Sequence, residues 1–400
     1  MHTPSAHKYK NRRCELKIAF ITHTTSVGGA ALSSSKTIQF LLDKGLLQPE
    51  ECLLIQPRCR DPSNEKNDLY YFLKQKIRHY EWQLPWSPVD QIGGYPSLTR
   101  KMYCFLITLR ALFFFIFLYP EILKKEKIQI VHLNSIVLWP ILLVLPNNVR
   151  AIIHVREGFL NSVEAKIAQK IIREKASAII SIDHFCAIPF SGNPKSIVIL
   201  NPFNMSKARM MKQSKNEIKK KYGISNDTFV VSVIGRIEKN KGQHLISSIA
   251  KKFNYDKIIF LVIGLPSGKF GKQSLKEIQQ YSNVKYLGQI NDMDQIYAIT
   301  DIVLRLDLID YFPLGRTVWE GIFSGCLAVL PVKKGYDLSS IQNLLNRYIF
   351  VYDYVDMDNL VSVLHSLLEK YPNTYKNDFP MSDNTEQSAI EFFNVLQKFS

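Results

Sequence analysis

Asp310–Gly325, with the sequence DYFPLGRTVWEGIFSG, is the stretch around which the fold of this chain can be predicted. The residues before it, 297–306 (YAITDIVLRL), are typical of a helix end followed by a short buried strand. A Pro-Leu-Gly turn then opens an apolar helix that carries one acid, Glu320. Backbone N–H groups and the positive dipole end at such a helix start suit a phosphate. The pattern predicts a strand, a ligand loop and a helix in the order found at nucleotide sites, although an ordinary helix start would look similar.

The length and the alternation of elements predict two domains. The chain has 400 residues, 46% of them hydrophobic, whereas single cores stop growing near ~250–300 residues. Strand-like runs alternate with helix-like runs in both halves, which favours an α/β chain of two Rossmann-like, doubly wound domains. We predict a first domain over residues 1–202 and a second over residues 203–380, facing each other across a cleft. Residues 381–400 are expected to form a helix, because their apolar residues recur at helical spacing.

The formal charge of +16 is compatible with nucleic acid, an anionic membrane surface or phosphorylated substrates as partners. The basic residues are spread along the chain and no nucleic-acid motif accompanies them, so we expect no nucleic-acid partner. The six cysteines form neither a CxxC pair nor a zinc-type spacing with histidine, so we expect no metal site. The basic amino terminus is followed by an apolar run too short for a signal peptide, which favours the cytoplasm.

Residues 102–119, MYCFLITLRALFFFIFLY, are apolar nearly all round. Arg110 lies in the middle of this run and Pro120 ends it at a length marginal for spanning a bilayer. Basic residues flank it on both sides. Two interpretations remain open, a core helix and a helix on an anionic membrane surface, while a transmembrane span is the least favoured.

The first half of the chain offers two groups of candidate ligand residues. Gly28 and Gly29 follow a β-branched run, residues 16–22, and open a predicted helix that closes near Gly45. Paired glycines there let backbone amides approach a phosphate, although they also simply make turns. A polar cluster, His154-Val-Arg-Glu, comes at the end of another strand. Side chains just beyond parallel strands project into the ligand crevice, and Asn134 with Ser135 has the same place after the preceding strand.

In the second half, a predicted strand ends at Gly235 and is followed by Arg236 and Lys241 before a helix predicted to begin near Gly242. An arginine fork and a lysine point charge across one loop would suit a diphosphate. The alternative is a solvated loop, because GRIEKNKG is rich in charge and turn formers.

These segments resemble the retaining glycosyltransferases of the glycosyl transferases group 1 (family 4) type, which have the GT-B fold. The resemblance is carried by segments in the family's order, and it is more specific in the second half. They are AFITHTTSVGGA, IIHVREG and VILNPFN in the first half, then VSVIGRIEKNKG, FLVIG, VKYLGQI, ITDIVLRL and PLGRTVWEGIFSG in the second.

The resemblance implies transfer of a sugar from a nucleotide donor with retention at the anomeric carbon. It also implies that residues 1–202 form the acceptor-side domain, that residues 203–380 form the nucleotide-sugar-binding domain, and that the helix in residues 381–400 crosses back to the first domain. Arg236 and Lys241 would hold the donor diphosphate without a metal or other cofactor, and His154 would lie near the transferred sugar. Glu320 would accept hydrogen bonds from the ribose hydroxyls. The remaining donor-binding positions implied are glycines and backbone amides: Gly28, Gly29, Gly235, Gly315, Arg316, Thr317 and Val318.

One position departs from the family's pattern. The first of its two acids normally stands eight positions before the second, where this chain has Phe312. Either Asp310 substitutes through a two-residue insertion, which we favour and which makes Asp310 a candidate catalytic residue, or the first acid is lost. Arg305, Leu306 and Asp307 also stand where the family usually has Pro-Ser.

The sequence therefore predicts a retaining, nucleotide-sugar-dependent hexosyltransferase that extends a lipid-linked or polysaccharide acceptor in bacterial-type cell-surface glycan synthesis. The expected location is the cytoplasm, with peripheral attachment to the inner face of the membrane. The alternatives are a GT-B-fold sugar-nucleotide epimerase and a non-catalytic glycosyltransferase-like binding or assembly subunit.

Overall fold

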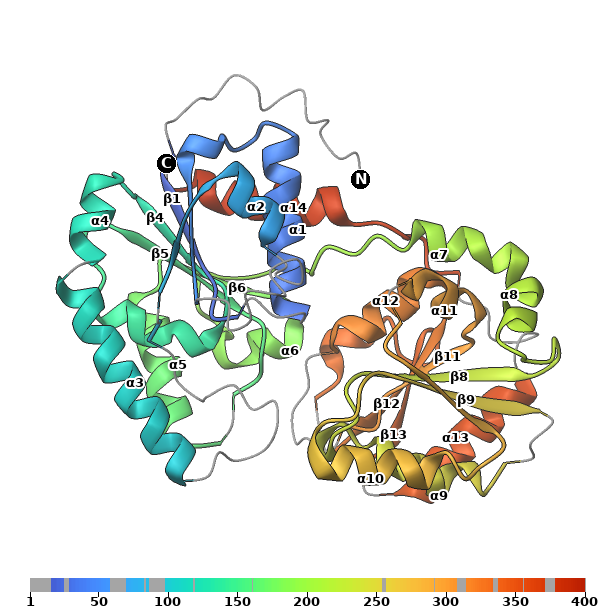
Figure 1. Cartoon of the computed structure of the whole chain (residues 1–400). Coiled ribbons are helices and arrows are strands. Elements are labelled where there is room, and N and C mark those ends of the chain that lie inside the picture. The colour runs from blue at the N-terminus through green and yellow to red at the C-terminus, as the bar shows by residue number, and fades with distance from the viewer. Residues whose placement is uncertain are drawn as a thin grey trace. The chain divides into compact units, whose positions relative to one another are not determined.

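The computed structural model divides the chain into two compact units, which Figure 1 draws. The first unit comprises residues 1–202 with 385–400, and the second comprises residues 203–384. The residues that the structure describes are 16–24, 29–57, 70–82, 84–85, 98–117, 119–159, 161–253, 257–290, 292–307, 314–333, 337–354, 356–370 and 378–399.

The first unit is built on a parallel sheet of seven strands in the order β3-β2-β1-β4-β5-β6-β7. Its strands are β1 (Ile18–Ile21), β2 (Cys52–Gln56), β3 (Arg78–Glu81), β4 (Ile130–Leu133), β5 (Arg150–Val155), β6 (Ala178–Ser181) and β7 (Ser196–Val198). Its helices are α1 (Gly29–Asp43), α2 (Tyr71–Lys76), α3 (Leu98–Phe117), α4 (Tyr119–Lys125), α5 (Val163–Lys175), α6 (His184–Ala187) and α14 (Thr385–Gln397), with a 3-10 segment at Ile136–Leu143.

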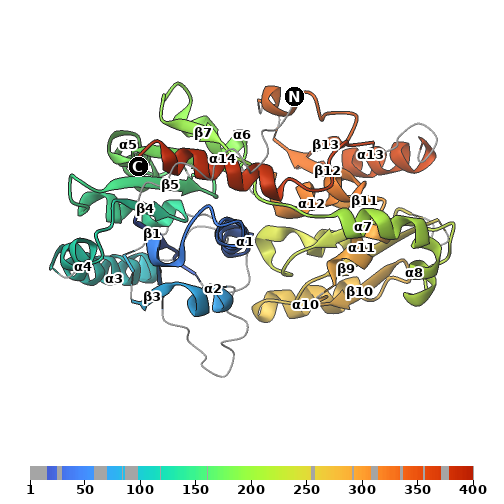
Figure 2. The ribbon, with the colours of Figure 1, turned by 90° about the horizontal axis from the view of Figure 1, so that it is seen from above.

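Helices cover both faces of this sheet, so its inner strands β2, β1, β4 and β6 are buried on both sides, as parallel strands usually are. One face packs against α3, α4 and α5 through Phe115, Leu123 and Ile172. The other face packs against α1, α2 and α14. The last helix, α14, lies beside α1 (Figures 1 and 2) and contributes Phe392 and Leu396 to that second core.

The second unit has a parallel sheet of six strands in the order β10-β9-β8-β11-β12-β13. Its strands are β8 (Phe229–Ile234), β9 (Ile258–Ile263), β10 (Val284–Gly288), β11 (Ile302–Leu304), β12 (Leu327–Val332) and β13 (Ile349–Asp353). Its helices are α7 (Ser206–Met211), α8 (Lys215–Lys221), α9 (Ile246–Ala250), α10 (Gly268–Ile278), α11 (Met293–Ile299), α12 (Arg316–Ser324) and α13 (Met357–Lys370).

This sheet is also sandwiched between helices (Figure 1). Helices α9, α10 and α13 cover one face with apolar side chains that include Ile249, Ile278 and Leu364. Helices α8 and α11 cover the other with Ile218 and Ile296. Both units are therefore doubly wound α/β domains, and the predicted fold class is confirmed.

Each sheet reverses its strand order at one place, between β1 and β4 in the first unit and between β8 and β11 in the second. At such a switch point the loops after the two neighbouring strands run in opposite directions, which leaves a crevice where ligands bind in this class of fold. The residues that follow these four strands are therefore the first candidates for a functional site.

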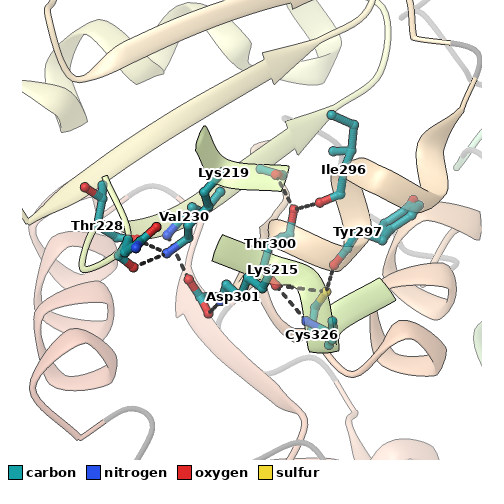
Figure 3. Close-up of polar contacts among 12 residues, drawn as sticks. Lys215, Lys219, Thr228, Val230, Ile296, Tyr297, Thr300, Asp301 and Cys326 are labelled. Atoms are coloured by element: carbon teal, nitrogen blue, oxygen red, sulfur yellow. Dashed lines mark hydrogen bonds and ion pairs between the residues drawn. The ribbon is translucent and has the colours of Figure 1, made fainter. Parts of the chain in front are cut away.

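A buried polar cluster fixes the opposite, amino-terminal ends of β8 and β11. Figure 3 shows Asp301, just before β11, accepting a hydrogen bond of 2.9 Å from the backbone nitrogen of Val230 and pairing with the ammonium of Lys215. In the same cluster, Thr300 hydrogen-bonds the carbonyl oxygen of Ile296 at 2.7 Å. These contacts set the register of the two strands whose other ends carry the candidate site.

Candidate functional site

Lys241 forms a partly buried ion pair that joins the two strand ends at the switch point of the second unit. Its Nζ lies 3.0 Å from Oδ2 of Asp307, which follows β11 and is only 7% exposed at its side chain. The same carboxylate oxygen pairs with Nη2 of Arg305. A second donor of that guanidinium, Nη1, lies 2.7 Å from the carbonyl oxygen of Leu314. Arg305 therefore holds both residues that border segment 308–313.

Asp307 is kept ionised although it is buried. Burial alone would raise the pKa of its carboxyl group, but the Arg305 and Lys241 cations and their hydrogen bonds outweigh this effect and lower the pKa below its usual value. The carboxylate of Asp307 thus orients two cationic side chains, Arg305 and Lys241, at this edge of the sheet.

Arg236 also follows β8, but its side chain is turned to solvent. The side chain is 67% exposed and its Nη2 lies 3.8 Å from Oε1 of Glu238. Arg236 and Lys241 are thus each paired with a different acid rather than meeting in one clamp. The backbone oxygens of Gly235 and Arg236 both accept from Nε2 of Gln243, at 3.4 and 2.8 Å, so the loop backbone is fixed while the arginine side chain stays accessible.

Gly242 adopts a left-handed conformation that closes this loop. Its φ is 72°, and a Cβ atom at this position would lie 1.8 Å from the carbonyl oxygen of Leu306. The close approach of the two backbones brings the 3-10 turn containing Lys241 against the end of β11. The predicted helix start near Gly242 is therefore displaced, and α9 begins at Ile246 after a second 3-10 turn.

We expect Gly242→Ala to destabilise the second unit by more than about 3 kcal/mol, because backbone strain and a backbone clash act together. Gly268→Ala is the matched control, since Gly268 has a similar φ of 61° but open space around its Cβ position. Strain alone should cost about 1–2 kcal/mol there. Urea denaturation of both variants measures the difference, and equal losses would contradict the proposed clash.

Gly315 caps α12 with a φ of 74°, so the chain enters the helix through a conformation that favours glycine. Thr317 and Val318 lie in the first turn of this helix, where backbone N–H groups have no acceptor within the helix. The Arg316 guanidinium lies over the ring of Phe203, 5.0 Å from its centroid. The helix start predicted from the sequence is confirmed, while the binding roles of these residues remain predictions.

Glu320 is held by two partners from its own unit. Its Oε1 lies 2.6 Å from Nε of Arg316, one turn earlier on α12. Its Oε2 accepts a hydrogen bond of 2.8 Å from the hydroxyl of Tyr297, a residue with no solvent exposure. The carboxylate is 17% exposed, so it is oriented by the protein and still partly accessible.

The strand ends of the first unit carry a buried network centred on Arg156. Its Nε donates to Oδ1 of Asn134 at 2.7 Å, and its Nη1 donates to Oδ1 of Asn201 at 2.6 Å. Its Nη2 lies 3.3 Å from Nδ1 of His154, and Nε2 of His132 lies 3.3 Å from the same ring nitrogen. The sequence predicted a polar cluster here, and the structure brings it together.

These contacts determine the tautomer of His154. A guanidinium donates hydrogen bonds and never accepts them, so Nδ1 of His154 must accept and the ring proton must lie on Nε2. Burial, followed by the charge of Arg156, lowers the pKa of His154 well below its usual value and keeps the ring neutral. In the described part of the chain, Nε2 of His154 is buried without a hydrogen-bond partner. It lies beside a small pocket lined by residues of α1, β4, β5, α14 and the segment before α7.

The same network reaches the glycine loop. Helix α1 begins at Gly29, and Nδ2 of Asn134 donates to the carbonyl oxygen of Ala30 at 3.4 Å. Ser135 donates to Oε1 of Glu157 at 2.9 Å, which joins the ends of β4 and β5. The start of α1 is thus tied to both strand ends across the switch point.

Several sequence predictions lie outside the described residues. Gly28, Asp310 and Phe312 are among them. The choice between Asp310 as a substitute acid and a lost first acid therefore stays open.

Four other residues near these sites were not predicted to be functional. They are His132, Tyr297, Arg305 and Asp307. The sequence drew attention to Arg305 and Asp307 only because residues 305–307 replace the family's usual Pro-Ser. It did not indicate that Asp307 pairs with Arg305 and Lys241. Within the described ranges, no group of three or more His, Cys, Asp and Glu side chains is placed to hold a metal ion.

The second unit matches a known family. Residues 214–378 match the family model described as glycosyl transferases group 1. No curated protein matches the chain.

Solved structures of similar fold cover nearly the whole chain. Anabaena HepE in complex with UDP has a TM-score of 0.67 at 16% identity, covering 96% of this chain and 98% of that one. A glycosyltransferase from Rickettsia africae has a TM-score of 0.64 at 16% identity, covering 96% of both chains. Acinetobacter baumannii MurG has a TM-score of 0.57 at 14% identity, covering 96% of this chain and 99% of that one.

Two doubly wound, parallel-sheet domains in one chain are the architecture of the GT-B class, and this protein has that fold. Its second unit carries the glycosyl transferases group 1 domain, over residues 214–378.

Proposed function

We propose that this protein is a retaining hexosyltransferase that moves a sugar from a nucleotide-sugar donor to a lipid-linked or polysaccharide acceptor. The proposed setting is cell-surface glycan synthesis in the cytoplasm, at the inner face of the membrane. The observation that supports it most is the orientation of Lys241 at the switch point of the glycosyl transferases group 1 domain, where Asp307 pairs with both Lys241 and Arg305.

The donor diphosphate is proposed to bind between Lys241 and Arg236. Lys241 is oriented by its ion pair and Arg236 is accessible, so both can neutralise charge on a departing nucleoside diphosphate. These cations would do the work that a metal does in other phosphate sites, and we propose that the reaction needs no metal or other cofactor. Anabaena HepE, which has the same fold, has been solved with UDP and with UDP-glucose, so UDP-sugars are the first donors to test.

The transferred sugar is proposed to lie near His154 of the first unit. The fixed tautomer makes Nε2 of His154 a hydrogen-bond donor at neutral pH, which suits a sugar hydroxyl oxygen. Gly29 at the start of α1 and the first-turn amides of α12 are proposed to approach the donor phosphates. Asp310 is proposed as the acid that recognises the sugar hydroxyls.

The test is direct binding and turnover with a panel of UDP-, GDP- and ADP-sugars, using the purified full chain. We expect one nucleotide class to bind in preference to the others and its sugar to be transferred or slowly hydrolysed. The anomeric configuration of the product, measured by NMR, should match that of the donor. Failure to bind any nucleotide would refute the proposal, inversion would refute the retaining mechanism, and binding without turnover would indicate a binding subunit.

Glu320 is proposed to accept hydrogen bonds from the ribose hydroxyls. We expect Glu320→Gln to weaken binding of the preferred nucleoside diphosphate by more than about 1 kcal/mol, because a charge-assisted hydrogen bond is lost in a partly buried site. It should also narrow the difference in affinity between that nucleotide and its 2′-deoxy analogue. Calorimetry measures both quantities.

Glu369→Gln is the matched control for this prediction. Glu369 is an exposed acid on α13 of the same unit, and its substitution should leave both affinities unchanged. Full discrimination against the 2′-deoxy analogue in Glu320→Gln would remove Glu320 from the ribose site.

A further inference from the structure

Helix α3 presents large apolar side chains to solvent along one side. Six of them are between 49% and 66% exposed: Met102, Phe105, Leu106, Leu109, Phe113 and Ile116. At 100° per residue these positions fall within an arc of about 100° and extend over roughly 21 Å of helix. We call this row the α3 stripe. Soluble monomers rarely expose a continuous apolar surface of this kind unless it binds something.

The opposite side of α3 is the one that holds the helix to its unit. Ala111 and Phe115 are buried there, and Phe115 belongs to the core that covers one face of the sheet. Figure 1 shows α3 along the outer margin of the first unit. The α3 stripe is therefore not a core surface that happens to be poorly packed, since the same helix already has a separate buried side.

Basic side chains accompany the stripe. Arg110 and Tyr103 are exposed and lie along the same border of the stripe, about two helical turns apart. Helix α4 packs next to α3 and ends in exposed Lys124 and Lys125, followed by exposed Lys127. An apolar side with arginine and tyrosine along its border, and lysines on the adjoining helix, is the composition of helices that lie in the interface of a bilayer with anionic lipids.

The charge distribution also decides between a bilayer and a second copy of this chain. If two copies paired through the stripe, their basic borders would be brought together, and the whole chain already carries a formal charge of +16. An anionic lipid surface instead neutralises the same cations. Within the described residues, no helix is long and apolar enough to cross a membrane.

We propose that the α3 stripe inserts into the headgroup and upper acyl region of an anionic bilayer and holds the enzyme there without spanning it. The inference rests on the proposed function in one respect: the attachment would give the enzyme access to an acceptor carried by the membrane. The attachment itself follows from the stripe and its basic border.

Sedimentation with sucrose-loaded vesicles tests the inference with the full chain and no nucleotide sugar, so its outcome is independent of donor binding and transfer. We expect binding to vesicles of phosphatidylcholine with about 30 mol% phosphatidylglycerol and much weaker binding to phosphatidylcholine alone. Phe105→Glu should lower the partition coefficient on the anionic vesicles by roughly tenfold or more, because a large side chain loses its apolar contact and an anion is added.

Phe72→Glu is the matched control. Phe72 is 69% exposed, close to the 61% of Phe105, but it lies on α2, which covers the other face of the sheet. This variant should bind vesicles as the unchanged protein does. Equal losses in the two variants, or no sedimentation of the unchanged protein, would overturn the inference. Conversion of a dimer to a monomer by Phe105→Glu, without vesicle binding by the unchanged protein, would make the stripe an interface between copies.

Discussion

Lys241→Ala is expected to lower the turnover number for sugar transfer by about 10²–10³-fold, the effect of removing one preorganised charge at a site of developing negative charge. The ammonium group of Lys241 lies 3.0 Å from Asp307 and is held there before any ligand binds. The fold should survive this change, because Asp307 keeps its second partner, Arg305. Turnover is measured with the donor that binds best in the nucleotide-sugar panel, and thermal denaturation checks the fold.

Lys239→Ala provides the control for this result. Lys239 belongs to the same 3-10 turn as Lys241 and is exposed. Its removal takes away one positive charge from the same loop without touching the ion pair at the strand ends. If the two variants lost the same activity, the effect would come from the general positive potential of the loop, and the specific role of Lys241 would be wrong.

The second large effect concerns stability in acid. Burial, together with the charge of Arg156, lowers the pKa of His132 from 6.5 to about 3. At pH 7 this histidine is neutral in both the folded and the unfolded chain. Below about pH 6.5 the unfolded chain binds a proton that the folded chain cannot, so stability is lost as the pH falls toward about 3. Between pH 7 and pH 4.5 we expect His132 alone to cost the first unit about 2–3 kcal/mol.

His132→Gln tests this prediction, because glutamine keeps a donor that reaches Nδ1 of His154 but does not titrate. The free energy of unfolding is measured in urea at pH 7 and at pH 4.5. Its decrease between these two pH values should be about 2–3 kcal/mol smaller in this variant than in the unchanged protein. His79→Gln is the control, since His79 is exposed on β3 and should leave the pH dependence as it is. If all three proteins showed the same pH dependence, His132 would not be the group that causes the loss of stability in acid.

Much of the fold was predictable because buried parallel strands leave continuous apolar runs in the sequence. The runs around β1, β8 and β9 were recognised in this way, and the alternation with helices gave the doubly wound class. Strand β3 was missed because it lies at the sheet edge and reads Arg-His-Tyr-Glu, with no apolar run.

The candidate site was predictable in its positions but not in its pairings. Residues after parallel strands meet at one edge of a sheet, so His154 and Asn134 were expected near each other, and Arg156 joins them. The pairing of Lys241 with Asp307 joins residues 66 positions apart in the chain. It depends on the backbone contact at Gly242, which no spacing rule predicts.

For helix α3, the sequence could not predict which apolar side is buried. Because both of its sides are apolar, the hydrophobic pattern did not distinguish a core helix from a membrane-surface helix. The structure resolves one part of that question, since Ala111 and Phe115 are buried while Phe105 and Leu109 are exposed. Only the three-dimensional packing identifies which apolar side is already used.

Helix α14 has a consequence for biosynthesis. The second unit is a continuous segment, residues 203–384, and is complete before α14 has been translated. The first unit needs Phe392 and Leu396 of α14 to fill one side of its core. On the ribosome, residues 1–202 therefore wait with an incomplete core and an exposed apolar surface until residues 385–400 have been made. A nascent chain stalled before residue 385 should need a holding chaperone for its earlier half.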